Sequence, residues 1–353
     1  MDFNRSPLLV IWETTQACDL TCVHCRASAQ PGRHPDELTT AEGFRLLDEV
    51  KRFGEREKTT PLMVFTGGDP IKRPDLFELI RYSVKLGLRT NVSPSATPLL
   101  TPNTIQAFKG AGVARMAISV DGWDAASHDA FRGIPGTFDR AIQALRTAQA
   151  VGLETQFQTT VTRLNMGHLG EIAKIAEDVG AKMWSLFFLI VTGRARREDD
   201  LSAEEYEQAF EAIWSAAKRL PFDVKTTEAM HYRRFVARKL REEKVDRSHP
   251  LWRTAGVSDA KGFVFISHVG DIYPSGFLPL LGGNVRTESL VDVYRNSTLF
   301  QVLRDADLRE GKCGCCEYRN LCGGSRARAY AMTGNFLAED PRCAYQPEPV
   351  AHA

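Results

Sequence analysis

Three cysteines near the start of the chain have a spacing that suits iron–sulfur chemistry. Cys18, Cys22 and Cys25 are separated by three and by two residues and follow a short apolar run at 8–13. Three thiolates on one loop can hold three irons of a [4Fe–4S] cluster and leave the fourth iron free to bind a substrate. Structural zinc is the alternative, because zinc takes four ligands and His24 could be the fourth. The spacing favours a cluster with one open iron.

A second cysteine set lies near the end of the chain. Its four proposed ligands are Cys313, Cys316, Cys322 and Cys343. Four thiolates are enough to saturate a second [4Fe–4S] cluster, which would relay electrons or support the fold. A structural zinc site is again the alternative, since zinc accepts four thiolates. Cys315 is left over, and we interpret it as a spare thiol.

The distribution of the eight cysteines also indicates a compartment. None lies between residues 25 and 313, and the apolar run at 8–13 is too short for a signal peptide. We therefore expect a cytoplasmic protein, in which clustered thiols bind metal more often than they form disulfides. The formal net charge of +1 gives no overall attraction to nucleic acid. No apolar run approaches the roughly 20 residues of a membrane span.

The elements that must position these cysteines alternate between strands and helices. Strands are predicted at 8–13, 62–66, 88–93, 116–120, 154–161 and 184–190. Thr39 or Thr40 and Ser202 are expected to cap helices, the latter in a capping box with Glu205. The strands read as near-continuously apolar, which is typical of parallel strands covered on both faces. Six βα units predict an α/β fold with a partial (β/α)6 barrel, because a complete eight-stranded barrel needs about 250 residues.

The rhythm changes after about residue 220, which predicts a second unit. We expect the barrel at 1–230, a bridging segment at 231–260 and a small iron–sulfur domain at 261–353. Residues 262–268 and 271–274 are predicted to form a hairpin that turns at Val269 and Gly270. The first cysteine set follows the first barrel strand, which is the end where such barrels place their chemistry.

With the motif Gly67-Gly68-Asp69-Pro70 after the second strand, the first cysteine set resembles the radical S-adenosylmethionine (AdoMet) superfamily. The family usually has Glu where this chain has Asp69. The resemblance implies that AdoMet chelates the open iron and is reductively cleaved to methionine and a 5′-deoxyadenosyl radical. It also implies a low-potential electron donor of the flavodoxin or ferredoxin type.

The resemblance further implies a set of AdoMet contacts. The candidates are His24, Gly67, Gly68, Asp69, Pro70, Ser95, Ser119 and Arg132. His24 would pack beside the adenine, and the glycines would let the backbone approach the methionine group. Ser119 and Arg132 would contact the ribose or the carboxylate, and Ser95 is a further candidate. The alternative for Ser119 is an ordinary hydroxyl at the end of a strand, and the alternative for Arg132 is a surface charge.

The C-terminal cysteines resemble the auxiliary-cluster region of SPASM enzymes, which modify peptides and sulfatases. Full SPASM domains hold two auxiliary clusters, and one ligand usually follows the hairpin near a Tyr-Pro. Here Tyr273-Pro274 is followed by Ser275. The resemblance therefore implies a single auxiliary cluster.

Residues 273–279 (YPSGFLP) and 322–330 (CGGSRARAY) resemble the branch of this group that modifies tetrapyrroles in haem biosynthesis. That resemblance implies hydrogen abstraction from a propionate side chain, followed by loss of CO2 or of the whole side chain. Cationic candidates for holding the substrate are Arg194, Arg196, Arg197, His231, Arg233, Arg234, Arg326 and Arg328.

Two alternatives to tetrapyrrole chemistry stay open. Peptide modification is the first, although a barrel that begins by about residue 8 leaves no room for a preceding recognition domain and so favours a small substrate. A non-catalytic, zinc-stapled binding protein is the second.

Overall fold

The computed structural model describes residues 2–55, 60–244 and 256–347, and its centre is one sheet of ten strands. The strands are β1 (Leu9–Glu13), β2 (Leu62–Thr66), β3 (Thr90–Val92), β4 (Arg115–Ser119), β5 (Glu154–Val161), β6 (Met183–Phe188), β7 (Asp223–Thr227), β8 (Phe263–Ile266), β9 (Asp271–Tyr273) and β10 (Gly283–Asn284). Their order in the sheet is β10-β9-β8-β1-β2-β3-β4-β5-β6-β7.

The α/β class and the partial barrel are confirmed, and all six predicted strands are present. Two further strands run parallel to them: β7 beside β6, and β8 beside β1. The predicted hairpin is also present, because β9 pairs with β8 in antiparallel register. Among the described residues β7 and β10 form the two edges of the sheet, so the barrel stays open between them.

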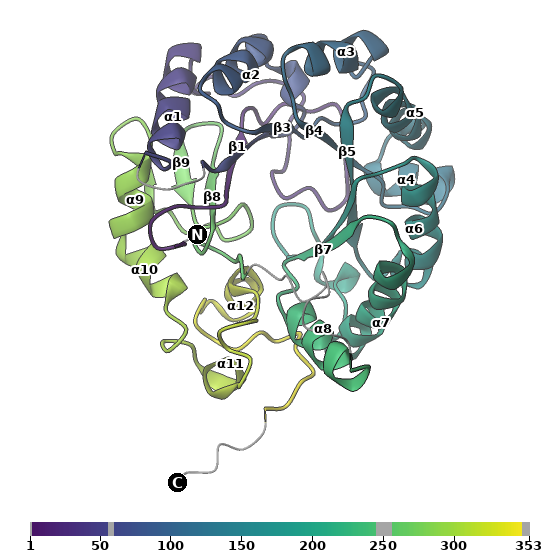
Figure 1. The fold of residues 1–353 in the computed structure, drawn as a ribbon, viewed down its shortest axis with the longest axis vertical. Coiled ribbons are helices and arrows are strands. Elements are labelled where there is room, and N and C mark those ends of the chain that lie inside the picture. The colour runs from purple at the N-terminus through teal and green to yellow at the C-terminus, as the bar shows by residue number, and fades with distance from the viewer. Residues whose placement is uncertain (1, 56–59, 245–255, 348–353) are drawn as a thin grey trace.

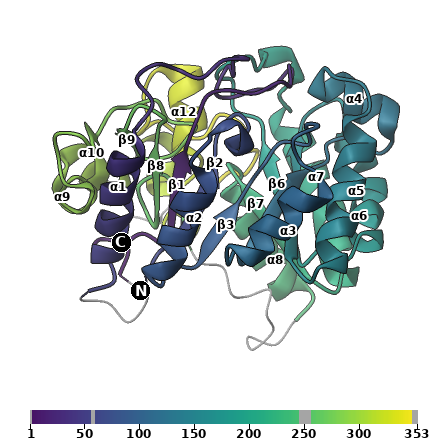
Figure 2. The same cartoon turned by 90° about the horizontal axis from the view of Figure 1, so that it is seen from above.

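Helices surround this sheet (Figure 1). They are α1 (Thr40–Arg52), α2 (Leu76–Lys85), α3 (Pro102–Gly110), α4 (Ala125–Arg132), α5 (Thr137–Ala150), α6 (Leu169–Asp178), α7 (Ala203–Arg219), α8 (His231–Glu242), α9 (Leu290–Asn296), α10 (Thr298–Arg304), α11 (Gly311–Cys315) and α12 (Arg326–Thr333). The view from above shows α9 and α10 beside α1 (Figure 2). Helices α11 and α12 lie between α10 and α8, on the open side of the barrel (Figure 1).

Local sequence explains where these helices begin. Thr39 and Ser202 each form a capping box with the glutamate three residues later. Thr101 caps α3, and Pro102 occupies its first position. No helix in the described ranges combines the length and apolar character that a bilayer crossing needs.

The inner face of the barrel differs from the near-continuous apolar strands that were predicted. In β5 the residues Phe157 and Val161 are buried against the helices, whereas Gln158 and Thr160 point to the other face and stay partly exposed. The prediction of apolar strands was therefore wrong for the inner face of β5. Polar side chains on that face are accommodated because it keeps contact with solvent.

The predicted C-terminal domain shares its sheet with the barrel, because β8, β9 and β10 extend from β1. The first part of the predicted bridge at 231–260 is helix α8, and residues 245–255 lie outside the described residues. The division into domains stays a prediction.

Candidate functional site

The loop after β1 brings the first three cysteines together with hydrogen-bond donors. Leu20 N donates to Cys18 Sγ at 3.4 Å, and Ala29 N donates to Cys25 Sγ at 3.5 Å. The third sulfur, Cys22 Sγ, accepts from the Arg132 guanidinium at 3.7 Å. Hydrogen bonds to sulfur favour the thiolate, which is the form that binds metal.

The glycine motif after β2 is joined to this cysteine loop by backbone hydrogen bonds. Gly68 N donates to Thr15 O at 2.9 Å, and Asp69 N donates to Ala17 O at 2.7 Å. A Cβ at Gly68 would lie 2.4 Å from Ala17 O, and one at Gly67, where φ is +151°, would lie 2.4 Å from Thr15 O. Both positions therefore require glycine. Contact of these glycines with AdoMet stays a prediction.

The residues beside the glycines are internal braces. The buried Asp69 carboxylate accepts from Thr97 Oγ1 at 2.7 Å and from Ile71 N at 3.2 Å, at the start of a short turn that begins with Pro70. Burial raises the pKa of Asp69. Ser95 Oγ donates to Gly68 O at 2.8 Å and lies 3.6 Å from Cys18 Sγ. Ser95 thereby connects the glycine motif to the first cysteine.

Arg132 joins the cysteine loop to the end of β4. Its Nε donates to the buried Asp121 carboxylate at 2.6 Å. Burial alone would raise the pKa of Asp121, but Arg132, two nearby histidines and a backbone amide together more than offset this effect, so the net pKa is lowered. The His24 ring stacks on Phe131 with centroids 4.3 Å apart, and burial together with Arg132 lowers its pKa to about 3. His24 is therefore neutral near pH 7, and its packing beside an adenine stays a prediction.

Ser119 lies at the end of β4 on the inner face. Its Oγ donates to Gln158 Oε1 at 3.4 Å, and Ser93 Oγ donates to the same oxygen at 3.5 Å. These three residues form a polar sector on β3, β4 and β5 beside the cysteine loop. The structure thus gathers the predicted AdoMet residues at one end of the barrel, and their contacts with AdoMet stay a prediction.

The four C-terminal cysteines line one pocket. Cys313, Cys316, Cys322 and Cys343 are all among its lining residues. Gly323 and Gly324 both have positive φ, and a Cβ at Gly324 would lie 3.1 Å from Cys313 Sγ. The glycines therefore let the backbone pass between the cysteines.

Backbone amides point at these sulfurs as well. Asp340 N donates to Cys313 Sγ, Tyr318 N to Cys316 Sγ and Gly324 N to Cys322 Sγ, each at 3.4 Å. In contrast, Cys315 is exposed and its thiol donates to Lys312 O. Three of the four predicted ligands thus accept backbone hydrogen bonds, whereas the predicted spare thiol donates one.

Metal binding in this pocket requires deprotonated thiols. In the described ranges no three His, Cys, Asp or Glu side chains converge on one ion position. The choice between a cluster and a zinc ion at this pocket stays a prediction. Burial raises the pKa of Cys322 to about 12 and that of Cys343 to about 11, so ligation at neutral pH must displace their protons.

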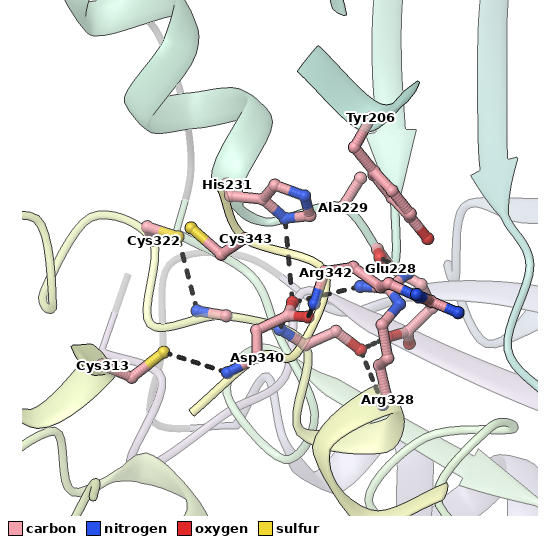
Figure 3. A network of polar contacts seen from close by, with 12 residues as sticks. Tyr206, Glu228, Ala229, His231, Cys313, Cys322, Arg328, Asp340, Arg342 and Cys343 are labelled. Carbon is pink, nitrogen blue, oxygen red and sulfur yellow. Dashed lines mark hydrogen bonds and ion pairs between the residues drawn. The ribbon is translucent and has the colours of Figure 1, made fainter. Parts of the chain in front are cut away.

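A buried polar network lies behind this pocket (Figure 3). Arg328 Nη1 lies 3.1 Å from Asp340 Oδ2, and its guanidinium stacks over the Tyr206 ring at 4.7 Å. His231 is fully buried, with Nδ1 3.7 Å from Asp340 Oδ2. Arg326 donates to Phe336 O, Ala338 O and Cys313 Sγ.

These contacts correct part of the sequence interpretation. Arg326, Arg328 and His231 were candidates for holding the substrate, but all three are buried in the C-terminal network, where arginines satisfy carbonyls and a carboxylate. Their interpretation as substrate contacts was wrong, because these side chains are buried and make their polar contacts inside the protein.

The remaining arginine candidates also have internal or solvent roles. Arg194 donates to Cys22 O at 2.9 Å and to Ala29 O at 3.2 Å, so it braces the cysteine loop. Arg196 and Arg197 are exposed. Arg233 donates to Val257 O and Leu321 O, and the buried Arg234 pairs with Glu207.

Sequence reasoning missed one group that faces the inner side of the barrel. It consists of Glu13, Arg26 and His268, joined by contacts between side chains far apart in sequence. The position of Arg26 directly after a cysteine does not predict its role, because the residues that contact it come from two separate strands.

Comparison with known proteins shows which family this chain resembles. A sequence profile of the Radical SAM superfamily matches residues 12–177. The AdoMet-dependent heme synthase of Nitratidesulfovibrio vulgaris is 42% identical over 345 residues, covering 96% of this chain and 92% of that protein. The enzyme of the same name from Methanosarcina barkeri is 37% identical over 348 residues, covering 98% of each.

The fold is shared more widely. Streptococcus suis SuiB bound to its precursor peptide SuiA superposes with a TM-score of 0.74 at 17% identity, covering 97% of this chain and 76% of that chain. This likeness shows the fold alone, whereas the two heme synthases share both sequence and length with this chain. The chain belongs to the radical SAM superfamily and is an enzyme of the kind that uses AdoMet and a [4Fe–4S] cluster.

Proposed function

We propose that this enzyme decarboxylates propionate side chains of an iron-bound coproporphyrin, as the last step toward haem. The observation that carries the proposal is the 42% identity to an AdoMet-dependent heme synthase over nearly the whole of both chains. Cys18, Cys22 and Cys25 would hold the catalytic cluster, and Cys313, Cys316, Cys322 and Cys343 an auxiliary one.

When bound, the catalytic cluster and AdoMet supply a 5′-deoxyadenosyl radical that takes one hydrogen atom. Loss of that hydrogen atom, of CO2 and of one electron turns a propionate into a vinyl group. The reaction therefore needs a one-electron acceptor, and we assign this role to the C-terminal site. We also propose a reducing cytosol as its location and a flavodoxin- or ferredoxin-type protein as electron donor.

The protein's own residues have three tasks in this scheme. Gly67 and Gly68 hold the cysteine loop against β2. Arg132 donates to Cys22 Sγ and partly offsets the burial that raises the pKa of this thiol, while Asp121 holds Arg132 in place. The polar sector of Ser119 and Gln158 presents hydrogen-bonding groups to a bound nucleoside.

The test is anaerobic incubation of the reconstituted enzyme with AdoMet, a reductant and iron-coproporphyrin, followed by mass analysis. We expect products that have lost one CO2 and two hydrogen atoms per modified propionic acid side chain, together with 5′-deoxyadenosine. Replacing Cys18, Cys22 or Cys25 with Ala should abolish 5′-deoxyadenosine formation. An unchanged porphyrin would contradict the proposal.

Peptide modification is the second candidate, because SuiB shares this fold and was crystallised with a peptide. If the wild-type enzyme makes 5′-deoxyadenosine but leaves the porphyrin unchanged, this alternative is favoured.

A further inference from the structure

A charged group lies on the inner face where β1 meets β8, beside the cysteine loop. Glu13 is the last residue of β1, and its side chain is only 5% exposed. One carboxylate oxygen accepts from Arg26 Nη2 at 2.6 Å, and the other lies 2.8 Å from His268 Nδ1. Burial alone would raise the pKa of Glu13, but Arg26 and His268 more than offset it, so the net pKa is lowered. Glu13 is thus an ionised anchor for the Arg26 guanidinium.

Arg26 keeps part of its hydrogen-bonding capacity unused. Within the described part of the chain, its Nε and Nη1 groups make no hydrogen bond, and the side chain is 24% exposed. Its guanidinium stacks over the Phe265 ring at 4.6 Å. A Cβ at Gly276 would lie 3.3 Å from Arg26 Nε, so the absence of a side chain there leaves this edge of the fork accessible.

Aromatic side chains accompany this arginine. Phe265 on β8 pairs in register with Ile11 on β1, so both face the inside of the barrel with Glu13. Phe277, in the segment after β9, lies 6.5 Å from Phe187 at the end of β6, measured between ring centroids. The inner face thus has an aromatic sector on β6 and β8, distinct from the polar sector of Ser93, Ser119 and Gln158.

The two sectors suit two different ligands. Serine hydroxyls and an amide suit a nucleoside, whereas aromatic rings with one anchored arginine suit a flat apolar ring that carries carboxylates. Because Glu13 binds the guanidinium at one Nη group, another edge of the guanidinium can donate a bidentate pair of hydrogen bonds to a second carboxylate.

We propose that Arg26, positioned by Glu13 and His268, binds a propionate carboxylate of the substrate while Phe187, Phe265 and Phe277 contact its ring. The inference rests on the proposed tetrapyrrole function and names the side of the site that recognises the substrate. Arg26 directly follows Cys25, so the carboxylate it holds lies close to the cluster loop.

The experiment compares Arg26→Gln and Arg26→Lys with the wild type, using equilibrium dialysis under anaerobic conditions. Iron-coproporphyrin III and its tetramethyl ester are the two probes. Loss of a charge-assisted hydrogen bond should weaken binding of the acid about 10- to 100-fold in Arg26→Gln, and binding of the ester less than about 3-fold. Arg26→Lys, which keeps the charge without the fork, should fall between. Arg146→Gln is the matched control, since Arg146 is exposed on the surface of α5.

The outcomes separate the two proposals. If wild-type enzyme binds neither probe, the tetrapyrrole function and this inference fall together. If the wild type prefers the acid and Arg26→Gln keeps that preference, only the inference falls. It also falls if the variants raise the AdoMet concentration needed for 5′-deoxyadenosine formation, or if both lose the catalytic cluster, because Arg26 would then serve AdoMet or the loop.

Discussion

Arg132 donates hydrogen bonds both to the sulfur of Cys22 and to the buried carboxylate of Asp121. Asp121 is almost fully buried and receives hydrogen bonds from Arg132 Nε at 2.6 Å and from Thr160 N at 2.7 Å. Removing one partner of such a pair leaves the other charge buried and uncompensated. We expect Asp121→Asn to lower the free energy of unfolding by about 3 kcal/mol, measured by denaturant titration.

The matched control is an exposed ion pair that also consists of an aspartate and a basic side chain. Asp178 and Lys174 are joined at 3.0 Å on the exposed side of α6, and both side chains are more than half exposed. Asp178→Asn should therefore change the free energy of unfolding by less than about 0.5 kcal/mol. Equal effects of the two Asp→Asn variants would contradict the role given to Asp121.

The C-terminal cysteines differ in what their sulfurs do, and this makes their roles testable. Cys316 Sγ accepts a backbone hydrogen bond in the pocket, whereas Cys315 donates one at the surface. We expect Cys315→Ala to keep all the iron, and Cys316→Ala to lose about half of it, since one of two four-iron clusters would be missing. The measurement is iron, zinc and sulfide content after anaerobic reconstitution. Bound zinc with near-zero iron would restore the zinc alternative.

The turn after β2 shows how one element fixes the geometry of another. Gly68 packs against the backbone of the cysteine loop, where a Cβ would lie 2.4 Å from Ala17 O. Backbone cannot rotate away as a side chain can, so Gly68→Ala must displace the loop at a cost of about 1–3 kcal/mol. We expect lower stability, measured by thermal unfolding, and loss of catalytic iron.

Gly170 in α6 provides the control, because no atom lies within 4 Å of a Cβ built there. Gly170→Ala should be neutral or stabilise the protein by up to about 1 kcal/mol. A Gly68→Ala variant that retains its catalytic iron would show that the loop does not depend on this contact.

Elements with strong local signals were predictable from sequence. The six strands between 8 and 190 were predicted because each has a clear apolar run. Helix α1 was predicted from a threonine cap at Thr39 or Thr40, and α7 from the capping box of Ser202 with Glu205. The two cysteine sets were predictable for the same reason, since ligand spacing is local. Residue type and spacing suffice where the contacts are close in sequence.

Features that depend on distant contacts were missed. Strand β7 has the sequence DVKTT, which carries no apolar run, and it forms through pairing with β6. The parallel pairing of β8 with β1 joins residues about 250 positions apart. Arg326 and Arg328 were misread as substrate contacts, since only the fold shows that they are buried. Arg26 was overlooked because its partners Glu13 and Phe265 come from separate strands.

The molecule as a whole is joined across the open side of its barrel. Glu228, directly after β7, accepts from Ser325, which caps α12, while Arg328 of the same helix donates to Glu228 O. Asp259, shortly before β8, is a second buried acid at this junction. Helix α12 therefore contacts both Glu228, after the edge strand β7, and, through the amide of Ala327, the buried Asp259 before β8.

This junction should make stability depend on pH. Burial, with Asp259 nearby, raises the pKa of Glu228 above its ordinary value of 4.5, and Arg328 only partly offsets this. The folded state thus keeps a proton that the unfolded chain releases near pH 4.5, so the stabilisation present below that pH is lost as pH rises toward the folded-state pKa. One such proton changes stability by at most about 1.4 kcal/mol per pH unit.

We expect the thermal unfolding midpoint of the wild-type protein, measured at a fixed scan rate, to decrease as the pH is raised from 5 to 8. Glu228→Gln should fall less steeply, because a neutral amide keeps the acceptor for Ser325 and has no proton to lose. Glu78→Gln, on the exposed face of α2, should follow the wild-type curve. If Glu228→Gln and the wild type have the same slope, the junction does not hold the proton, and the acid that titrates is elsewhere in the fold.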